Sequence, residues 1–200
     1  MNKKSLLVLG LGLIAVALVT ALLLILNPTR RASETPPAPP PPQLGGGSTA
    51  QEAYRALQPW ATDWSAENNL IALSASLQKV GQTEGGWTCQ LYAPAKKKLA
   101  VVTVVTGEVR LLKEQTALYP QQTIDPTAWP LDSSDLFAQW WTERGAVIWS
   151  QPQAQSLYFQ LSTQPDDTVT WTISVLSTEG KVLDFWEVNA ATGEVIAGTH

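Results

Sequence analysis

Hydrophobic and polar positions between Trp171 and Val195 alternate as in an antiparallel meander of strands. Two apolar runs are separated by a polar turn, and Gly193 follows where a tight reversal requires a positive φ. The stretch from Trp87 to Val109 has the same order of features, and both stretches open with Trp-Thr and close with Thr-Gly-Glu-Val. The spacing from the Trp to the closing Thr is 19 residues in the first stretch and 21 in the second, a difference that one hairpin loop accommodates. The pattern predicts one supersecondary unit that is used twice.

Apolar residues recur at helical spacing in front of each meander. The segment Ser48-Thr-Ala-Gln-Glu52 offers two overlapping capping boxes for a first helix, and Pro59 predicts a kink or a break in it. A second helix is predicted to begin at Asp132 and to end at Gly145, because Gly is common just after a helix. Further strands are predicted at 71–77, 146–150 and 156–162.

These elements predict an α+β fold of two repeated units, each a helix packed on a three- to four-stranded antiparallel sheet. The predicted organisation is a cytoplasmic N-terminus at 1–4, a transmembrane signal anchor at 5–26, a Pro- and Gly-rich linker at 27–48, unit 1 at 49–113, a connection at 114–131 and unit 2 at 132–200.

The end of the second stretch carries a family resemblance. The segment Glu187-Val-Asn-Ala-Ala-Thr-Gly-Glu-Val-Ile196 resembles the end of a PepSY domain, a propeptide-type module in which a strand ending near an Asp or Asn runs into Ala-x-Thr-Gly-Glu-Val. The first copy, Val104-Val-Thr-Gly-Glu-Val109, is shorter and lacks the Asn-Ala-Ala. With the predicted anchor in front, the layout is similar to TseB-like membrane-anchored cell-envelope proteins with tandem cystatin-like or PepSY-like domains. The resemblance implies a PepSY-like or cystatin-like fold for each unit.

The predicted anchor is an uncharged run of 22 residues at 5–26. As a helix it would reach about 33 Å, enough for a hydrocarbon core of about 30 Å. A cleaved signal peptide is the alternative, although its apolar core would be shorter and followed by a small-x-small site. The retained anchor predicts a single-pass protein of the cell membrane with its C-terminal domain extracytoplasmic. The positive-inside rule favours this orientation of the anchor only slightly, because Lys3 and Lys4 precede the apolar run and Arg30 and Arg31 follow it.

The linker at 27–48 holds seven of the fourteen prolines. Residues Pro36 to Pro42 predict a stiff polyproline II spacer, and Gly45 to Ser48 predict a flexible joint. A proline-rich ligand for an SH3 or WW partner is the alternative.

The charge of residues 49–200 excludes two classes of partner. This part has nine Lys or Arg against sixteen Asp or Glu, a net charge of −7. Nucleic acid and anionic lipid both require a basic surface, so we expect neither to bind it.

Few residues of the chain could carry chemistry. Cys89 is the only cysteine and aligns with Ile173 in the second stretch, which predicts a small buried residue; a reactive or dimer-linking thiol is the alternative. His200 is the only histidine, which leaves no Ser-His-Asp triad, Cys-His pair or zinc site. The adjacent acids Asp166 and Asp167 lie in a predicted turn and are interpreted as turn formers rather than a catalytic dyad. We therefore predict a protein that is not an enzyme, with no catalytic, cofactor-binding or metal-binding residues.

All nine tryptophans lie in residues 49–200. Those at helical spacing are predicted to face the sheet as core: Trp60, Trp64, Trp140 and Trp141. Trp129 and Trp149 lie outside the periodic segments, so we expect them to be exposed and to form a possible interaction surface.

The leading functional hypothesis is a non-catalytic, membrane-anchored extracytoplasmic module that binds or regulates another cell-envelope protein. The resemblance implies the partner class, a peptidase or a cell-wall enzyme; the small sheets with edge strands support protein binding independently. The alternative is a domain that binds carbohydrate or a small ligand through exposed Trp. An enzyme that uses carboxylates alone is the third hypothesis.

Overall fold

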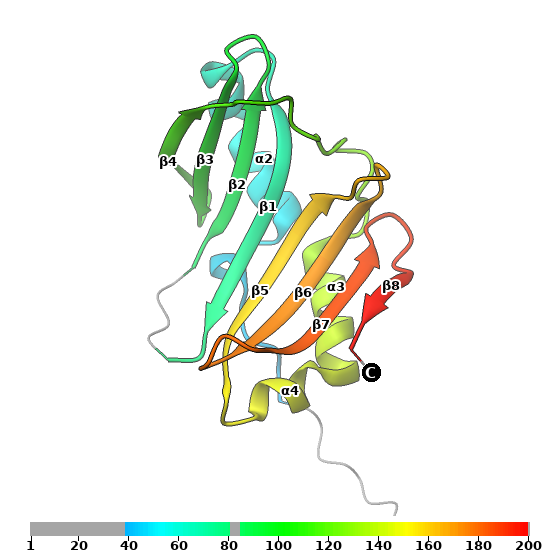
Figure 1. The fold of residues 1–200 in the computed structure, drawn as a ribbon. Helices are drawn as coiled ribbons and strands as arrows, with labels where there is room; N and C mark the ends of the chain where they lie inside the picture. Colours follow the sequence, from blue (N-terminus) through cyan, green and yellow to red (C-terminus); the bar gives the residue numbers. More distant parts are fainter. Residues whose placement is uncertain (1–38, 81–84, 200) are drawn as a thin grey trace, which may run out of the picture. The chain divides into compact units, whose positions relative to one another are not determined.

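Eight antiparallel strands form one continuous sheet in the computed structural model, which describes residues 39–80 and 85–199 (Figure 1). The first half contains η1 (Gly45–Gly47), α2 (Ala50–Trp64), β1 (Asn69–Gln78), β2 (Trp87–Ala93), β3 (Lys98–Val105) and β4 (Glu108–Thr116). The second half contains α3 (Ser133–Trp140), η2 (Trp141–Gly145), α4 (Ala146–Ser150), β5 (Ala154–Thr163), β6 (Val169–Ser177), β7 (Val182–Asn189) and β8 (Val195–Gly198).

The strand order corrects the predicted fold class. The order is β4-β3-β2-β1-β5-β6-β7-β8, so the two meanders are halves of one sheet. Strands β1 and β5 join them through seven antiparallel residue pairs, from Ala72↔Ser162 to Gln78↔Ser156. The prediction of two repeated units, each a helix on its own sheet, is therefore wrong. Units of about 70 residues bury a small core on their own, and the β1–β5 pairing removes the two edges that separate units would expose.

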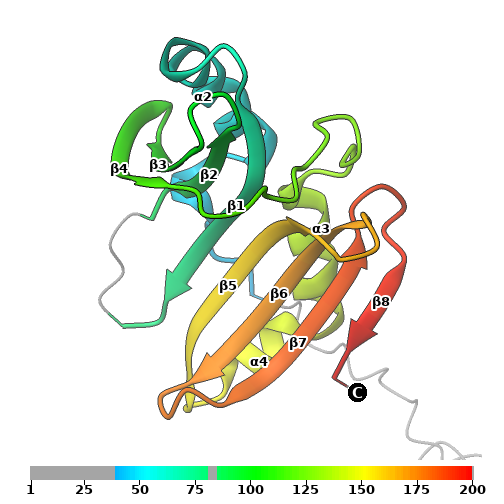
Figure 2. The ribbon, with the colours of Figure 1, turned by 45° about the horizontal axis from the view of Figure 1, so that its top comes forward.

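One hydrophobic core lies between the sheet and the helices, which lie on the same face of the sheet (Figures 1 and 2). The burial of β2 alternates along the strand, because every second side chain points toward the helices. Trp87 of β2 and Trp171 of β6 are both fully buried, with ring centroids 6.3 Å apart. Phe159 of β5 lies beside both, stacked on Trp171 at 4.6 Å. The aromatic side chains therefore connect the two halves of the sheet.

Helix α2 begins at the predicted capping box and does not break at Pro59. The Thr49 side chain accepts a hydrogen bond from the Glu52 amide, and the Glu52 carboxylate accepts one from the Thr49 amide. The helix runs through the exposed Pro59 to Trp64. Proline removes one hydrogen bond on the solvent side, while Leu57 on the other side is fully buried against the sheet. Burial of the apolar face outweighs that loss.

The second helical segment continues past Gly145, where the sequence predicts its end. Gly145 has a helical φ of −58°, and the chain continues through α4, so the predicted strand at 146–150 is a helix. A Cβ on Gly145 would lie 2.5 Å from the Trp140 ring. This glycine is required by close packing rather than by a helix end.

The last residues of the predicted linker belong to the folded part of the chain. Gly45 is buried, and a Cβ there would lie 2.0 Å from Trp87 Nε1. The same indole nitrogen donates a hydrogen bond of 2.9 Å to the Ser48 carbonyl. The predicted flexible joint at Gly45 to Ser48 is therefore a packed turn.

The predicted membrane anchor at 5–26 lies outside the described residues. In residues 39–80 and 85–199, no helix is long and apolar enough to cross a membrane. Within these residues, the predicted single-pass membrane location with a transmembrane signal anchor is corrected to a folded part without a spanning helix.

Gly193 has the positive φ that its place in the turn predicts. Its φ is +75°, and the turn is closed by a hydrogen bond of 2.9 Å from the Gly193 amide to the Asn189 carbonyl. A β-branched residue is strained in this region of φ, so we expect Gly193→Val to lower the free energy of unfolding by about 1 to 3 kcal/mol. Thermal melts measure the change. Gly193→Asn is the matched control, because Asn tolerates positive φ, and it should lose less. A valine variant as stable as native would contradict this assignment.

Candidate functional site

Trp129, predicted to be exposed, is a core residue. Its side chain is 2 % exposed and lies edge-on to Tyr54 of α2 and to Trp171, with centroid distances of 5.8 and 6.0 Å. Its indole Nε1 is buried without a hydrogen-bond partner in the part of the chain that the structure describes. The prediction of an exposed Trp129 is therefore wrong.

Trp149 of α4 is half-buried and packs against the core. The Lys79 ammonium lies 5.8 Å from its ring centroid and donates a hydrogen bond of 2.8 Å to its carbonyl. Trp149 therefore has a structural partner, and its ring is not a free platform. The structure does not bring the two predicted surface residues together at one exposed site. Of the nine tryptophans, six are buried and three are half-buried.

Surface cavities are present among the described residues. One of 240 Å³ lies between residues 41–49 and α3, and one of 300 Å³ lies beside Trp129, Tyr54 and Arg55. The third, of 350 Å³, lies beside Asp166 and Glu187. All three are open to solvent.

Cys89 occupies the buried strand position that the alignment with Ile173 predicts. Both residues are fully buried, and burial raises the pKa of the Cys89 thiol to about 12. The reactive thiolate is therefore scarce at neutral pH. We expect a water-soluble thiol reagent to label the native chain at least 100-fold more slowly than the chain in denaturant, because labelling requires opening of the structure. Equal rates would show that the thiol is accessible.

The described residues hold no group of three or more His, Cys, Asp or Glu side chains that could bind a metal ion. Asp166 and Asp167 lie in an exposed turn, where the Thr168 amide donates a hydrogen bond of 3.1 Å to Asp166. That bond lowers the pKa of the Asp166 carboxyl. Asp166 is therefore a turn-forming residue, as its sequence position predicts.

The free edge of the sheet at β4 is the candidate site for binding another chain. Strand β4 is nine residues long and pairs with β3 alone among the described strands (Figure 1). Every residue of β4 is exposed except Val109, which is half-buried. An edge strand presents a row of backbone amides and carbonyls that can pair with another chain.

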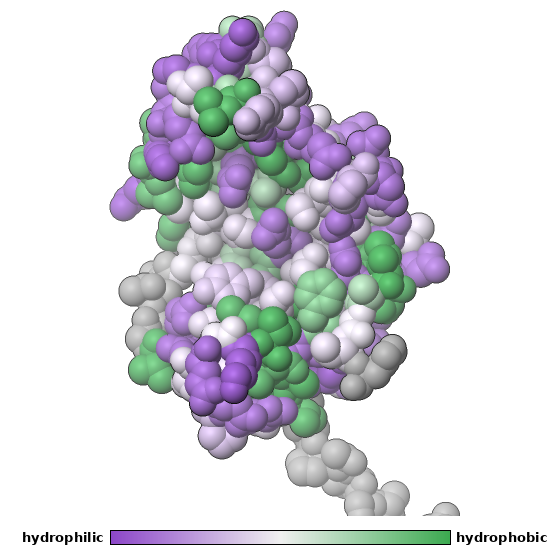
Figure 3. Space-filling view, in the orientation of Figure 1, coloured by the Kyte–Doolittle hydropathy of each residue, from purple (hydrophilic) through white to green (hydrophobic). Residues whose placement is uncertain are grey.

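Two leucines lie at the middle of this edge. Leu111 is opposite Val102 and Lys113 is opposite Val101, so Leu112 is the extra residue of a β-bulge. Leu111 is 46 % exposed and Leu112 is 62 % exposed. Apolar side chains lie over β4 among hydrophilic ones (Figure 3). Natural edge strands are often protected by charged side chains and bulges, and here Arg110 and Lys113 lie directly beside the two leucines at the bulge.

Charged residues of both signs flank the leucines. Arg110 forms an ion pair of 3.0 Å with Glu108, and Lys98 forms one with Glu114. Trp64 Nε1 donates a hydrogen bond of 2.7 Å to Glu114. The hydrogen bond from Lys98, and then that from Trp64, lower the pKa of Glu114. The two leucines of the strand are therefore flanked on both sides by charged residues.

The opposite edge of the sheet is short and tied down. Strand β8 has four residues, and the following Thr199 donates a hydrogen bond of 2.6 Å to the buried Asp184. The Asp184 carboxylate also accepts a hydrogen bond of 2.9 Å from Trp140 Nε1 and lies 3.4 Å from the Arg144 guanidinium. These polar groups are satisfied, so this cluster has a structural role.

The comparisons with known proteins give no family. No family model matches the chain, and no curated protein matches it. Among solved structures, a presumed lipoprotein from Clostridium difficile 630 is similar to this chain, with 9 % identity, a TM-score of 0.48, and coverage of 74 % of this chain and 91 % of that chain. A likeness of this size carries no argument about fold or function. The resemblance to the PepSY domain stays a prediction.

Proposed function

We propose that this chain is a non-catalytic protein-binding module that takes up an extended segment of its partner as an added strand along β4. The observation that carries the proposal is the nine-residue free edge with Leu111 and Leu112 exposed at its centre. Backbone hydrogen bonds along the edge supply affinity, and side-chain contacts supply selectivity.

The side chains of β4 define the segment that fits. An added strand that places apolar residues beside Leu111 and Leu112 removes them from water, which contributes about 25 cal/mol per Å² of apolar area buried. The charged residues on both sides favour partner residues of the opposite sign and limit pairing in other registers. The preferred ligand is a segment with alternating apolar and polar residues and no internal proline. A peptidase or cell-wall enzyme as the partner remains a prediction from the resemblance.

The absence of an exposed indole in the described part weakens the carbohydrate-binding alternative, because sugar stacking requires an accessible ring face.

The test selects ten-residue peptides from a random displayed library on the immobilised full chain. We expect the enriched peptides to show period-two alternation and to lose at least about ten-fold in affinity for Leu112→Pro, since an added strand makes β4 a central strand, where proline is poorly tolerated. Leu112 has no residue opposite it in β3, so proline there disturbs the β3–β4 pairing least.

Leu118→Pro is the matched control, because Leu118 is 82 % exposed and lies outside the strand. Binding that both proline variants retain, or enriched peptides without alternation, would contradict strand addition at β4.

A further inference from the structure

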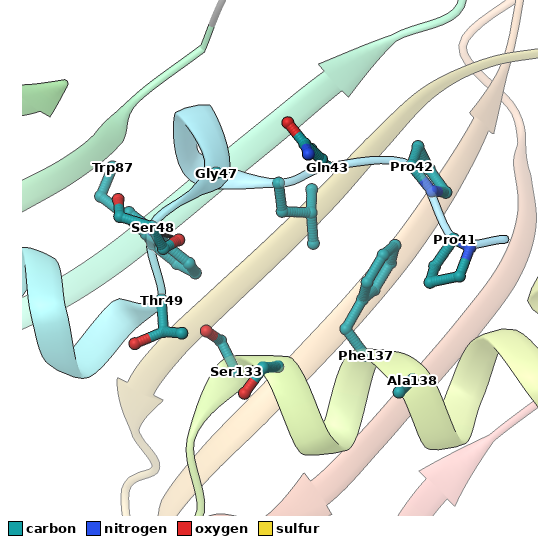
Figure 4. A pocket seen from close by; sticks show the side chains of 12 residues that line it. Pro41, Pro42, Gln43, Gly47, Ser48, Thr49, Trp87, Ser133, Phe137 and Ala138 are labelled. Carbon is teal, nitrogen blue, oxygen red and sulfur yellow. Dashed lines mark hydrogen bonds between the residues drawn. The ribbon is translucent and has the colours of Figure 1, made fainter. Parts of the chain in front are cut away.

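A second surface, away from β4, holds the chain's own proline-rich segment. Residues 39–44 run along α3, and the ring of Phe137 points from α3 toward the segment that carries Pro41 and Pro42 (Figure 4). Trp141, at the start of η2, donates a hydrogen bond of 2.7 Å from Nε1 to the Pro39 carbonyl. Phe137 and Trp141 are each 5 % exposed, and their ring centroids are 6.1 Å apart. We call this surface the Phe137–Trp141 groove.

The chemistry of the groove fits a polyproline II segment. Four consecutive prolines at 39–42 have no backbone N–H, so this segment offers only carbonyl acceptors and ring surfaces. The groove supplies the complement, two aromatic rings and one indole donor. Proline-rich segments dock on aromatic grooves with little loss of entropy, because they are already extended.

The proline segment is held at its ends and loosely between them. After it, Leu44 packs against the core and Gly45 is buried beneath Trp87. Pro39, Pro40 and Pro41 are exposed, and a cavity of 240 Å³ remains beside the segment. The Trp141–Pro39 hydrogen bond is the contact that ties down the first proline. Departure of the prolines would uncover the rings of Phe137 and Trp141, while Leu44 and Gly45 keep the following turn packed on the core.

We propose that the Phe137–Trp141 groove binds a proline-rich segment of a partner protein, and that residues 39–42 occupy it as an intramolecular competitor until displaced. The groove does not use β4, so this binding is independent of strand addition. A tethered competitor acts at an effective concentration in the millimolar range. The native chain therefore binds a free proline-rich peptide about ten- to a hundred-fold more weakly than a chain whose groove is empty.

The test titrates a fluorescent peptide with the sequence of residues 36–44, PPAPPPPQL, into two full-length chains and follows its anisotropy. One chain is native and the other has Pro39, Pro40, Pro41 and Pro42 replaced by Ser. We expect the serine chain to bind at least ten-fold more tightly. Adding Trp141→Phe to it keeps an aromatic ring, removes the donor and should weaken binding about ten-fold. Adding Trp149→Phe instead is the control and should leave binding unchanged.

A second measurement applies if the serine chain does not fold. The Trp141 indole N–H signal of the native chain, observed by NMR, should shift as excess peptide replaces the Pro39 carbonyl. Two results overturn the proposal: binding that is independent of Trp141, or no saturable binding to a folded serine chain together with an unmoved indole signal. The proposal is also overturned if the native chain is a dimer that the peptide dissociates. In that case the groove of one copy would hold the proline segment of the other copy.

Discussion

Trp171→Ala is expected to lower the free energy of unfolding by about 5 kcal/mol, the upper end of the range for removing a buried tryptophan. The side chain is fully buried, and its Nε1 donates a hydrogen bond of 3.1 Å to the Leu131 carbonyl. Its ring also contacts Trp87, Trp129 and Phe159. Alanine leaves a cavity, removes three aromatic contacts and takes the indole donor from the part-buried Leu131 carbonyl. Because small domains are stable by only about 5 to 15 kcal/mol, the variant should be close to unfolded at 37 °C.

Chemical denaturation of the full chain measures this loss. Trp149→Ala is the control, because Trp149 is half-buried, and it should cost roughly 1 to 2 kcal/mol. The native chain should unfold in one transition for residues 39–199, since Trp87 and Trp171 link the two halves through one core. A chain in which Trp171→Ala melts the second half while the first half stays folded would contradict the single core.

Asp184→Ala is expected to lower the free energy of unfolding by about 3 to 5 kcal/mol. Asp184 is 2 % exposed and joins three elements, because it accepts from Trp140 Nε1, pairs with Arg144 and accepts from Thr199. Alanine leaves the buried indole N–H without an acceptor and the guanidinium without its counter-charge. The end of β8 should also loosen, since Thr199 loses its anchor.

Thermal melts compare this change with two matched substitutions. Asp184→Asn keeps an oxygen acceptor and the side-chain volume, so it should lose less, about 1 to 3 kcal/mol. Asp166→Ala removes an acid from an exposed turn and should melt close to native. An Asp184→Ala variant as stable as the Asp166→Ala variant would show that the buried cluster does not stabilise the fold.

The sequence pattern predicted the strands β1 to β3 and β5 to β7, because strand alternation and turn chemistry are local, but it took the helix at 146–150 for a strand and predicted no strand at 110–116. The positive φ of Gly193 and the burial of Cys89 follow from a Thr-Gly turn and a period-two strand. The β1–β5 pairing could not be predicted in this way, since it joins Leu73 to Leu161, which are far apart in the chain. Without that pairing, two separate units were the simplest arrangement.

The errors at Gly145 and Trp129 have the same origin. A glycine at the end of a helical pattern resembles a helix end, and only the Trp140 ring packed against it explains its presence inside a continuing helix. Trp129 has no periodic neighbours, and its burial depends on contacts with Tyr54 and Trp171 from distant segments.

The sequence contains one local indication of the candidate site at β4. The adjacent Leu111 and Leu112 break the alternation of β4, which is typical of a β-bulge, but only the strand order shows that β4 lies at the edge. No local sequence pattern indicates the Phe137–Trp141 groove, because the groove depends on where the proline segment lies in the fold.

Hydrogen exchange of the full chain, with and without the peptide enriched on it, tests strand addition at β4 most directly. If the partner segment adds along β4, the amides of alternate residues between Glu108 and Thr116 should exchange at least ten-fold more slowly in the complex, because these N–H groups point to the free edge. The amides of β8 should be unchanged. Protection confined to other parts of the chain, with β4 exchanging as fast as in the free protein, would contradict the proposal.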